Sequence, residues 1–331
     1  MPWDWTPPTR TRLAKFLNAR GLMDGEIVTT PIGDGHSNLT HLVSDGVRQV
    51  VVRRPPPQPF PPGAHDVLRE ARVIGSLAAT PVPVARLLAT AQAGEVVDVP
   101  LYVMAFAAGS VVTAETPATL IHARRRIGET LVDTLADLHA VDWRAAGLSD
   151  YGRPEGFNAR HLRRIAQLVA DDNSQFVEIG AWLTARVPAE SGASIVHNDY
   201  RIGNVVLSSE FPGELVAVLD WELATLGDPL FDLGYFLASV PECAGPPTPT
   251  QKMGLAMLEP GYPTRKELAD RYAERTGADL TGLEWYMAFA LWKLAVLYEY
   301  GRRRGQDQYY ADPELVRSFV TAAHRVAGLE A

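Results

Sequence analysis

Residues 197–207 read HNDYRIGNVVL, and this stretch decides the fold of the chain. Asp199 follows a histidine by two residues and precedes Asn204 by five. A second stretch, VLDWELATLGDPLFDLGY at 218–235, brings another carboxylate, Asp220, thirteen residues after the first stretch ends. Phosphoryl transfer needs a carboxylate beside the attacking hydroxyl and oxygen ligands for the magnesium that neutralises the phosphates. The spacing therefore predicts a phosphoryl-transfer site, with Asp199 at the hydroxyl and Asn204 and Asp220 at the metal.

The flanking residues distinguish this pattern from a set of ordinary turns. A single Asp or Asn in a turn normally satisfies its own backbone, and a His beside such a turn is normally structural. Here apolar stretches surround the polar residues, at 193–196, 205–207 and 215–219. They predict strand, loop, strand, turn, strand, with the polar side chains at the strand ends. The grouped pattern therefore favours a catalytic site over unrelated turns.

Both stretches resemble motifs of the aminoglycoside phosphotransferase and choline kinase superfamily, whose fold is similar to that of protein kinases. Residues 219–235, LDWELATLGDPLFDLGY, are closer to one branch of it. They resemble the kinase-like domain that some acyl-CoA dehydrogenases carry at their N-terminus, and its stand-alone bacterial relatives. The resemblance runs from about residue 33 to about residue 300, and it is far more specific for the superfamily than for a substrate.

The resemblance implies an α+β fold with the two lobes of a protein kinase. Residues 1–106 would form the N-lobe, with a small antiparallel sheet and a hairpin that covers the nucleotide. Residues 107–331 would form a larger, mostly helical C-lobe that carries the catalytic and metal-binding loops. His197 would brace the catalytic loop by hydrogen bonding.

The composition is that of a globular protein, with 47% hydrophobic residues. No apolar run approaches the roughly 20 residues that span a bilayer, so no membrane partner is expected. The start, MPWDWTPPTRTR, lacks the apolar core of a secretion signal. A single cysteine, Cys243, excludes an intramolecular disulfide and fits a reducing compartment. We therefore expect a cytoplasmic location, and the oligomeric state stays open.

The formal charge of −8 is unevenly distributed along the chain. Residues 111–240 carry a net charge of −8, whereas residues 1–110 and 241–331 carry +1 and −1. No basic face stands out, which disfavours nucleic acid as a partner. The residues Arg302–Arg304 form a short basic run, which fits either a solvated helix end or an anchor for an anionic substrate.

The start of the chain shows the order of elements of a kinase N-lobe. A short amphipathic helix at 10–20 precedes predicted strands at 26–32, 39–44 and 49–53. The intervening GDGHSN, residues 33–38, predicts a glycine hairpin whose N–H groups, including those of Ser37 and Asn38, could cover nucleotide phosphates. Such a hairpin alone is normally only a turn.

A cation at the end of the third strand is the candidate phosphate ligand. Kinases usually place Lys there, paired with a Glu on the next helix. This chain has Arg53 and Arg54 in QVVVRRPPP, and strand alternation allows only one of them to face the nucleotide. The pattern of the family favours Arg53, with Arg54 as the competing candidate. Glu70, on a predicted helix at 64–79, would be its partner.

The strands at 84–89 and 101–106 lead into a link of small residues that ends at Gly109. In the superfamily such a link joins the lobes, and its backbone reads the adenine edge. The resemblance implies that the carbonyl of Ala105 and the N–H of Ala107 make these contacts.

Helices dominate the rest of the chain. A buried stripe at 117–140 includes His139, which is expected to be a packed core residue. Asp228 before Pro229 predicts an N-cap, and by resemblance it also braces the catalytic loop. Three helices would close the chain. Their starts are predicted by capping boxes at Thr264 with Glu267 and Thr281 with Glu284, and by Asp312 with Pro313.

These observations predict an ATP- and Mg²⁺-dependent transferase that phosphorylates a hydroxyl of a small molecule. The preference for ATP over GTP as the phosphoryl donor stays open. A protein kinase is disfavoured, because eight residues between Asp220 and Pro229 leave no room for an activation segment. A nucleotide-binding pseudokinase scaffold is the alternative from another class, and only the Arg at the lysine position favours it. An aminoglycoside phosphotransferase is a further alternative, but the near-neutral helices after residue 240 fit polycations poorly. The resemblance implies a hydroxy acid or hydroxyacyl thioester instead.

Overall fold

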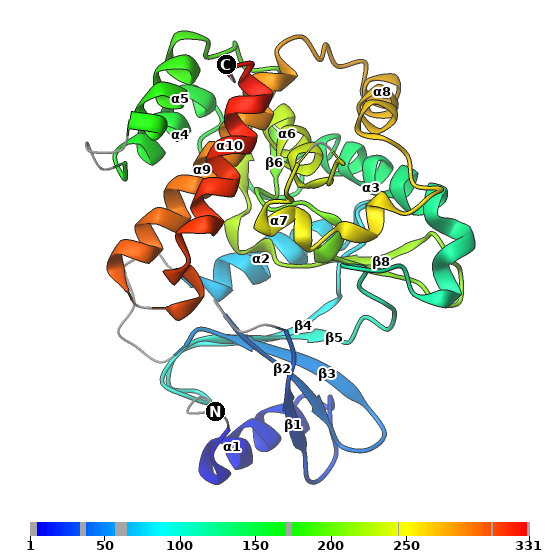
Figure 1. The fold of residues 1–331 in the computed structure, drawn as a ribbon. Coiled ribbons are helices and arrows are strands. Elements are labelled where there is room, and N and C mark those ends of the chain that lie inside the picture. The colour runs from blue at the N-terminus through cyan, green and yellow to red at the C-terminus, as the bar shows by residue number, and fades with distance from the viewer. Residues whose placement is uncertain are drawn as a thin grey trace. The chain divides into compact units, whose positions relative to one another are not determined.

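The computed structural model describes residues 5–33, 38–56, 65–169, 174–243, 245–305 and 307–329. Their contacts divide the chain into two compact units (Figure 1). Unit 1 comprises Met1–Ala108 and Val216–Glu222, and unit 2 comprises Gly109–Leu215 and Leu223–Ala331.

Unit 1 is built on a five-stranded sheet with the strand order β1-β2-β3-β5-β4, in which all neighbours are antiparallel. Its strands are β1 (Val28–Pro31), β2 (Leu39–Ser44), β3 (Gln49–Arg54), β4 (Leu87–Ala91) and β5 (Leu101–Ala105). The register places Arg53 of β3 opposite Thr40 of β2 and Tyr102 of β5. Polar and aromatic groups from three strands therefore meet at one point of the sheet.

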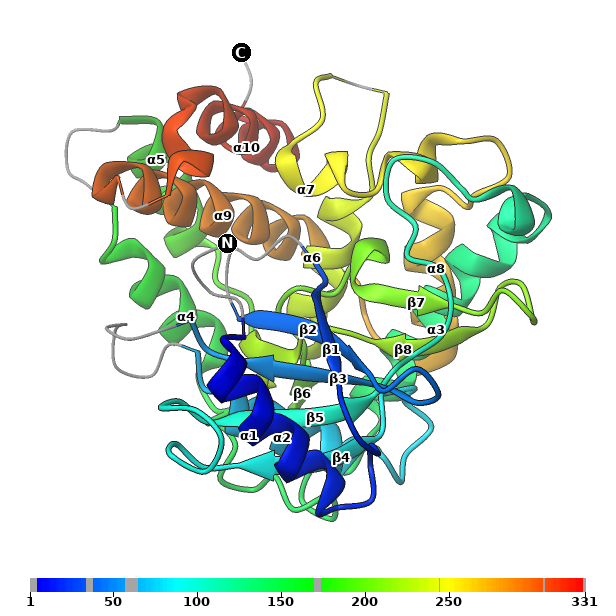
Figure 2. The same cartoon turned by 90° about the horizontal axis from the view of Figure 1, so that it is seen from below.

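One helix covers each face of this sheet. Helix α1 (Pro7–Asn18) buries Leu13 and Leu17 in a core that includes Val50 and Val52 of β3 (Figure 2). Helix α2 (Val67–Leu77) packs against β4 and β5, and its Glu70 bonds to Arg53. Because side chains alternate along a strand, Val50 and Val52 face α1 while Arg53 faces α2.

The segment 216–222 belongs to unit 1 although it lies far along the chain. It contains most of β8 (Leu215–Val218) and the start of the 3₁₀ helix η3 (Trp221–Leu223). Val218 forms a parallel bridge with Val84, and its N–H donates to the carbonyl of Pro83 at 2.8 Å. This attachment brings Asp220 and Glu222 into unit 1.

Unit 2 is mostly helical. Its α-helices are α3 (Arg124–His139), α4 (Phe157–Ala166), α5 (Ser174–Ala185), α6 (Pro229–Ser239), α7 (Pro249–Lys252), α8 (Arg265–Thr276), α9 (Leu283–Arg304) and α10 (Pro313–Ala327). The shorter elements are η1 (Ala118–Ala123), β6 (Ser194–Val196), η2 (Ile202–Asn204), β7 (Val205–Leu207), β9 (Thr225–Gly227), η4 (Leu255–Leu258) and η5 (Gln308–Ala311). β6 pairs with β9, and α9 lies beside both α6 and α10. Aromatic side chains fill the contact of α6 with α9, where the rings of Phe231 and Phe289 meet edge to face.

The predicted helix caps agree with the structure except at α9, and the helices expected at 10–20 and 64–79 begin at Pro7 and Val67. Asp228 caps α6, Asp312 caps α10, and Thr264 with Glu267 forms the capping box of α8. The capping box predicted at Thr281 is wrong. The N-cap of α9 is Gly282, whose φ of 82° is left-handed and which has no side chain to accept a hydrogen bond. No described helix is long and apolar enough to cross a membrane.

Candidate active site

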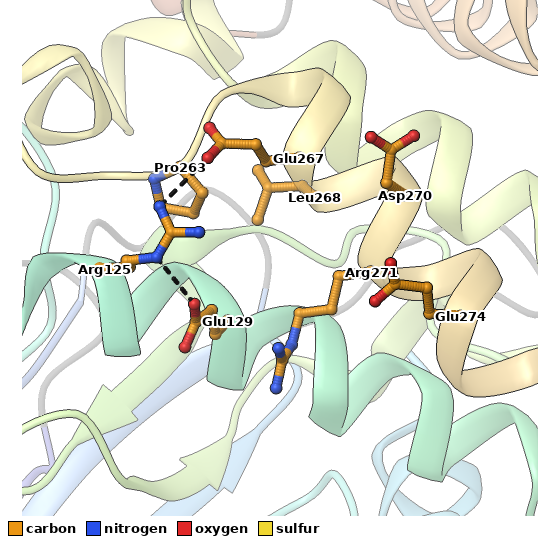
Figure 3. Close-up of a pocket in the computed structure, with 8 residues that line it drawn as sticks. All are labelled: Arg125, Glu129, Pro263, Glu267, Leu268, Asp270, Arg271 and Glu274. Atoms are coloured by element: carbon orange, nitrogen blue, oxygen red, sulfur yellow. Dashed lines mark hydrogen bonds and ion pairs between the residues drawn. The ribbon is translucent and has the colours of Figure 1, made fainter.

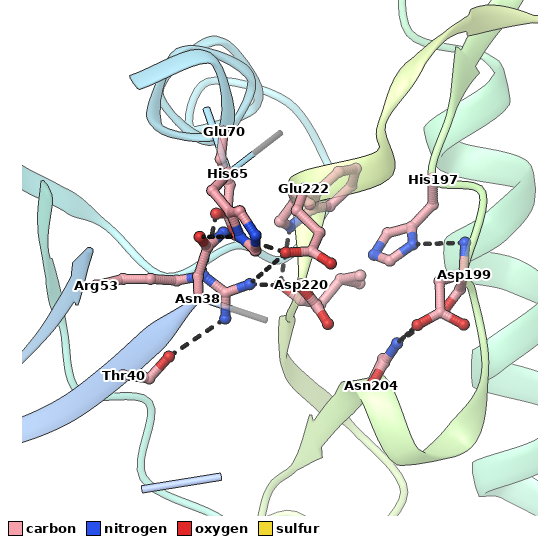
Figure 4. A network of polar contacts seen from close by, with 12 residues as sticks. Asn38, Thr40, Arg53, His65, Glu70, His197, Asp199, Asn204, Asp220 and Glu222 are labelled. Carbon is pink, nitrogen blue, oxygen red and sulfur yellow. Dashed lines mark hydrogen bonds and ion pairs between the residues drawn. The ribbon is translucent and has the colours of Figure 1, made fainter. Parts of the chain in front are cut away.

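The loop between β6 and η2 carries His197 and Asp199, and Asn204 ends η2. His197 is buried, and its Nδ1 accepts a hydrogen bond from the backbone N–H of Asp199 at 3.2 Å (Figure 4). Asn198 has a φ of 66°, a left-handed conformation that Asn tolerates better than most residues. The backbone therefore turns at the buried residue Asn198, immediately before Asp199.

The carboxylate of Asp199 is held in one orientation. Its Oδ2 accepts from Nδ2 of Asn204 at 2.7 Å, and the same nitrogen donates to the backbone carbonyl of Asp199 at 2.9 Å. Its Oδ1 accepts from the hydroxyl of Tyr235, and Nε of Arg201 lies 3.4 Å from this oxygen. The side chain of Asp199 remains 20% exposed. The neighbours of Asp199 thus fix its carboxylate, which is still accessible to solvent.

Helix α6 anchors the same loop through a buried carboxylate. Asp232 accepts from the backbone N–H groups of His197 and Asn198, the latter at 2.7 Å. Asp228 instead caps α6 and accepts from Ser191 and Tyr286. The expectation that Asp228 braces the catalytic loop is therefore wrong. Asp232, one turn further along α6, is the carboxylate that contacts the loop.

His139 lies in the packing around this anchor. Its Nδ1 is 2.6 Å from the hydroxyl of Tyr272, and its Nε2 is 3.5 Å from a carboxylate oxygen of Asp232. The ring also meets Tyr272 edge to face. These contacts agree with the predicted structural role of His139.

In unit 1, the guanidinium of Arg53 lies among three carboxylates. Its Nε donates to Glu70 at 3.0 Å, and its Nη2 donates to Asp220 at 2.6 Å and to Glu222 at 3.4 Å (Figure 4). Its Nη1 donates to Thr40 at 3.3 Å. One cation therefore organises carboxylates from α2 and from the segment 216–222.

The electrostatics of this cluster follow from burial and charge. Burial opposes the charged form of Arg53, but the carboxylates outweigh it and raise the pKa of Arg53 above its usual value. Burial raises the pKa of Glu70 to about 7, although Arg53 acts in the opposite direction. Asp220 and Glu222 contribute further to this increase. Three carboxylates thus share the one guanidinium of Arg53.

Arg54 lies on the other face of β3. Its guanidinium stacks over the ring of Trp5, 5.0 Å from the ring centre, on the side of the sheet that α1 covers. Of the two arginines, Arg53 is therefore the one that pairs with Glu70. Its role in nucleotide binding stays a prediction.

The remaining predicted nucleotide contacts lie at the ends of strands. Asn38 precedes β2, and its Nδ2 donates to Glu222 at 3.1 Å. Ser37 lies outside the described residues. Ala105 ends β5, where its N–H donates to the carbonyl of Arg86 at 2.9 Å, and Ala107 follows the strand. These positions neither support nor exclude the proposed contacts to a nucleotide.

The sequence analysis did not single out several side chains that contact the predicted site residues or their neighbours. They are Thr40, Arg201, Glu222, Tyr235 and Lys293. Glu222 and Tyr235 both lie within the stretch 218–235. Glu222 stands two residues after Asp220, and this closeness in the sequence could have identified it as a site residue. Lys293 is the one charged residue of the aromatic and apolar stretch 285–298 of α9, and this isolation was an available signal.

A separate surface pocket of about 230 Å³ lies between α3 and α8 in unit 2 (Figure 3). None of the predicted site residues lines it. Its charged groups already pair with one another, since Arg125 bonds to Glu129 and Glu267. We assign no function to this pocket.

Comparison with known proteins identifies the family. The sequence pattern of the phosphotransferase enzyme family matches residues 28–286. Acyl-CoA dehydrogenase family member 10 of Mus musculus is 28% identical over 86% of this chain. Family member 11 of Rattus norvegicus is 29% identical over 81% of it. The chain spans only 27% and 35% of the lengths of these two relatives.

Solved structures show the same fold. A protein of Ralstonia eutropha JMP134, provisionally named an aminoglycoside phosphotransferase, is 28% identical and covers 96% of this chain and 98% of its own, with a TM-score of 0.79. Aminoglycoside phosphotransferase APH(4)-Ia, solved with AMP-PNP and hygromycin B, is 17% identical. It covers 96% of this chain and 98% of its own, with a TM-score of 0.63, and at this identity it supports the fold alone. The predicted kinase-like α+β fold is confirmed, and the chain belongs to the phosphotransferase enzyme family.

Proposed function

We propose that this protein transfers the terminal phosphoryl group of ATP to a hydroxyl of a small molecule, with Mg²⁺ as cofactor. The arrangement around Asp199 carries the proposal. An accessible carboxylate, held by Asn204 and Tyr235 next to a buried histidine, is suited to orient a hydroxyl and accept its proton. The family of the chain supports the same reaction class.

The catalytic role of Asp199 depends on a fixed carboxylate. Two donors occupy part of its acceptor capacity, so the carboxylate cannot rotate freely when a hydroxyl approaches. His197 restrains the preceding backbone by accepting the N–H of Asp199. Such restraint reduces the entropy lost on reaching the transition state.

Asn204 and Asp220 are the proposed metal ligands. The nitrogen of Asn204 donates to Asp199, so its amide oxygen is the atom that can accept a cation. Asp220 uses Oδ1 for Arg53 and can offer Oδ2. Carboxylate and amide oxygens are the hard ligands that magnesium prefers. When bound, magnesium neutralises the charge of the phosphates and so supports in-line transfer.

Arg53 and Glu70 form the proposed phosphate-binding pair. Glu70 fixes the guanidinium through Nε, as the equivalent Glu fixes the Lys of kinases. The hairpin with Ser37 and Asn38 would cover the phosphates, and the backbone of Ala105 and Ala107 would hold the base. Structures of APH(4)-Ia contain AMP-PNP or ADP, so ATP is the first donor to test. A complex of aminoglycoside 2'-phosphotransferase-IIIa with GDP keeps guanine nucleotides among the donors to test.

For the acceptor we propose an uncharged or anionic hydroxy compound, such as a hydroxy acid or hydroxyacyl thioester. Arg201 lies beside Asp199, so a cation is present where an aminoglycoside would need carboxylates. The acyl-CoA dehydrogenase names of the relatives point in the same direction. The anchor role considered for Arg302 and Arg303 is weakened, because Glu299 pairs with both.

A coupled assay of ADP release tests the proposal. The acceptor panel contains hydroxy acids, their thioesters and kanamycin, with and without magnesium. We expect magnesium-dependent ADP release with at least one hydroxy acid or thioester, and a loss of about 10²–10⁴-fold in Asp199→Asn. Asp312→Asn makes the same chemical change at the cap of α10, where Asn caps equally well, and should retain activity.

Two outcomes would contradict the proposal. Nucleotide binding without transfer to any acceptor would favour the scaffold alternative. A specificity constant for kanamycin of about 10⁴ M⁻¹s⁻¹ or more, the low end of the usual enzyme range, would favour aminoglycoside modification instead.

A further inference from the structure

Lys293 is a buried lysine in the middle of α9. The chain contains four lysines and 27 arginines, so lysine is rare in this protein. Lys15, Lys252 and Lys266 are exposed, whereas Lys293 is only 4% exposed. Burying an ammonium group costs several kcal/mol unless other groups compensate. The position of Lys293 therefore requires a physical explanation.

The groups around the ammonium compensate it only in part. Its Nζ lies 3.4 Å from the backbone carbonyl of Asn198, 5.0 Å from the ring centre of Phe231 and 5.5 Å from that of Tyr235. Within the described ranges, no carboxylate forms an ion pair with Lys293. A carbonyl and two ring faces stabilise a cation, but less than a carboxylate in contact would. An apolar residue here would pack with the same neighbours at lower cost.

The carbonyl that Lys293 contacts belongs to the strained residue of the catalytic loop. Asn198 has a φ of 66°, and the peptide bond after it leads directly to Asp199. On the other side, Asp232 accepts the N–H groups of His197 and Asn198. An anion from α6 and a cation from α9 thus hold opposite ends of the same turn.

The same two helices contact the base candidate. Tyr235 stands three residues after Asp232 on α6, and its hydroxyl donates to the carboxylate of Asp199. The ammonium of Lys293 lies near the ring of Tyr235. Lys293 therefore contacts both the backbone before Asp199 and the side chain that orients its carboxylate.

We propose that Lys293 is a positioning residue for phosphoryl transfer, which holds the Asn198–Asp199 peptide and the ring of Tyr235 in the arrangement that aims the Asp199 carboxylate. This inference rests on the proposed function of Asp199. Without the ammonium, the carbonyl of Asn198 loses its donor, and the left-handed turn has one restraint fewer. The carboxylate would then sample orientations that do not meet the hydroxyl.

Lys293→Met tests the proposal, because Met keeps an unbranched side chain and removes the donor and the charge. We expect kcat to fall about tenfold or more, since small misplacements of reacting groups have effects of up to about 10²-fold. The KM for ATP should change less than about threefold, because Lys293 contacts no proposed nucleotide ligand. Thermal stability should not fall, which separates a positioning role from simple damage to the fold.

Two control variants separate the loss of a lysine charge from a disturbance of the packing of α9. Lys266→Met removes an exposed lysine on α8 and should leave kcat unchanged. Trp292→Phe disturbs the packing of α9 one residue away and removes the bond from Nε1 to Phe176. It should lower the thermal stability and leave kcat near the parent value.

Hydrogen exchange provides a measurement that does not depend on turnover. In Lys293→Met, the amides of His197 and Asn198 should exchange about tenfold faster than in the parent, whereas Trp292→Phe should not change them. If the parent shows no turnover but exchange increases as stated, the proposed function fails and the restraint by Lys293 stands. If Lys293→Met does not fold, Lys293→Leu removes the same donor and charge and serves for the same measurements. Unchanged exchange, or a kcat within twofold of the parent in a folded variant, would overturn the inference.

Discussion

Replacing Lys293 by Met should make the protein more stable at neutral pH. Burial lowers the pKa of Lys293 from its ordinary 10.5 to about 8, and Arg164 acts in the same direction. Asp199 and Asp232 act in the opposite direction but do not restore the usual value. With about 1.4 kcal/mol for each pH unit, the charged side chain destabilises the folded protein by roughly 3 kcal/mol at pH 7.

Removing the lysine also leaves the carbonyl of Asn198 without its donor. An unsatisfied buried polar group costs about 1–3 kcal/mol. The gain of roughly 3 kcal/mol should therefore exceed this cost in most of that range. We expect Lys293→Met to raise the free energy of unfolding by about 0–2 kcal/mol at pH 7.

The stability difference between Lys293→Met and the parent should depend on pH. The folded pKa of Lys293 lies below the unfolded one, so between pH 8 and 10.5 the unfolded chain binds more protons than the folded chain. The destabilisation by Lys293 is therefore complete below pH 8 and disappears toward pH 10.5. The stability advantage of Lys293→Met should shrink by about 2 kcal/mol between pH 7 and 9.5.

Urea unfolding at pH 7, 8 and 9.5 measures this difference. Tryptophan fluorescence follows the unfolding, and two of the seven tryptophans, Trp285 and Trp292, are buried in α9. Burial, together with Lys293, holds the pKa of His161 well below 6.5, so His161 does not titrate between pH 7 and 9.5. A variant less stable than the parent by more than about 1 kcal/mol at pH 7, or a difference independent of pH, would refute the reasoning.

The other predictions concern the proposed ligands and the base. Asp220→Ala should raise the magnesium concentration needed for nucleotide binding more than Asn204→Ala does, because a carboxylate binds magnesium more strongly than an amide; equal dependence in a magnesium titration would remove Asp220 from the metal site. Arg53→Lys should retain more ATP affinity than Arg53→Ala, since a cation remains while the planar fork is lost. Calorimetric titration measures this, and a large loss in Arg54→Ala alone would assign the phosphate contact to the wrong arginine. Tyr235→Phe should lower kcat by about tenfold, as expected for loss of a bond to a charged group, with the KM for ATP unchanged; equal kcat in steady-state assays would exclude an orienting role.

Much of the site could be predicted from the sequence because its signals are local. The five-residue spacing from Asp199 to Asn204 is short enough for one loop and one 3₁₀ turn to bring the two side chains together. Strand alternation separates Arg53 from Arg54 within a single element. The caps at Asp228 and Thr264 depend on side chains and N–H groups within a few residues of each other. Local geometry follows from local sequence in these cases.

The contacts that only the tertiary structure decided connect residues far apart in the chain. The pairing of Asp232 with the N–H groups of His197 and Asn198 spans 35 and 34 residues, and nothing in the order of residues favours it over Asp228. Lys293 reaches the carbonyl of Asn198 across 95 residues. Such pairs form because α6 and α9 pack through their aromatic faces, and this packing determines which polar groups meet in the interior. The sequence determined which residues can perform the chemistry, and the packing of distant helices determined what holds them in place.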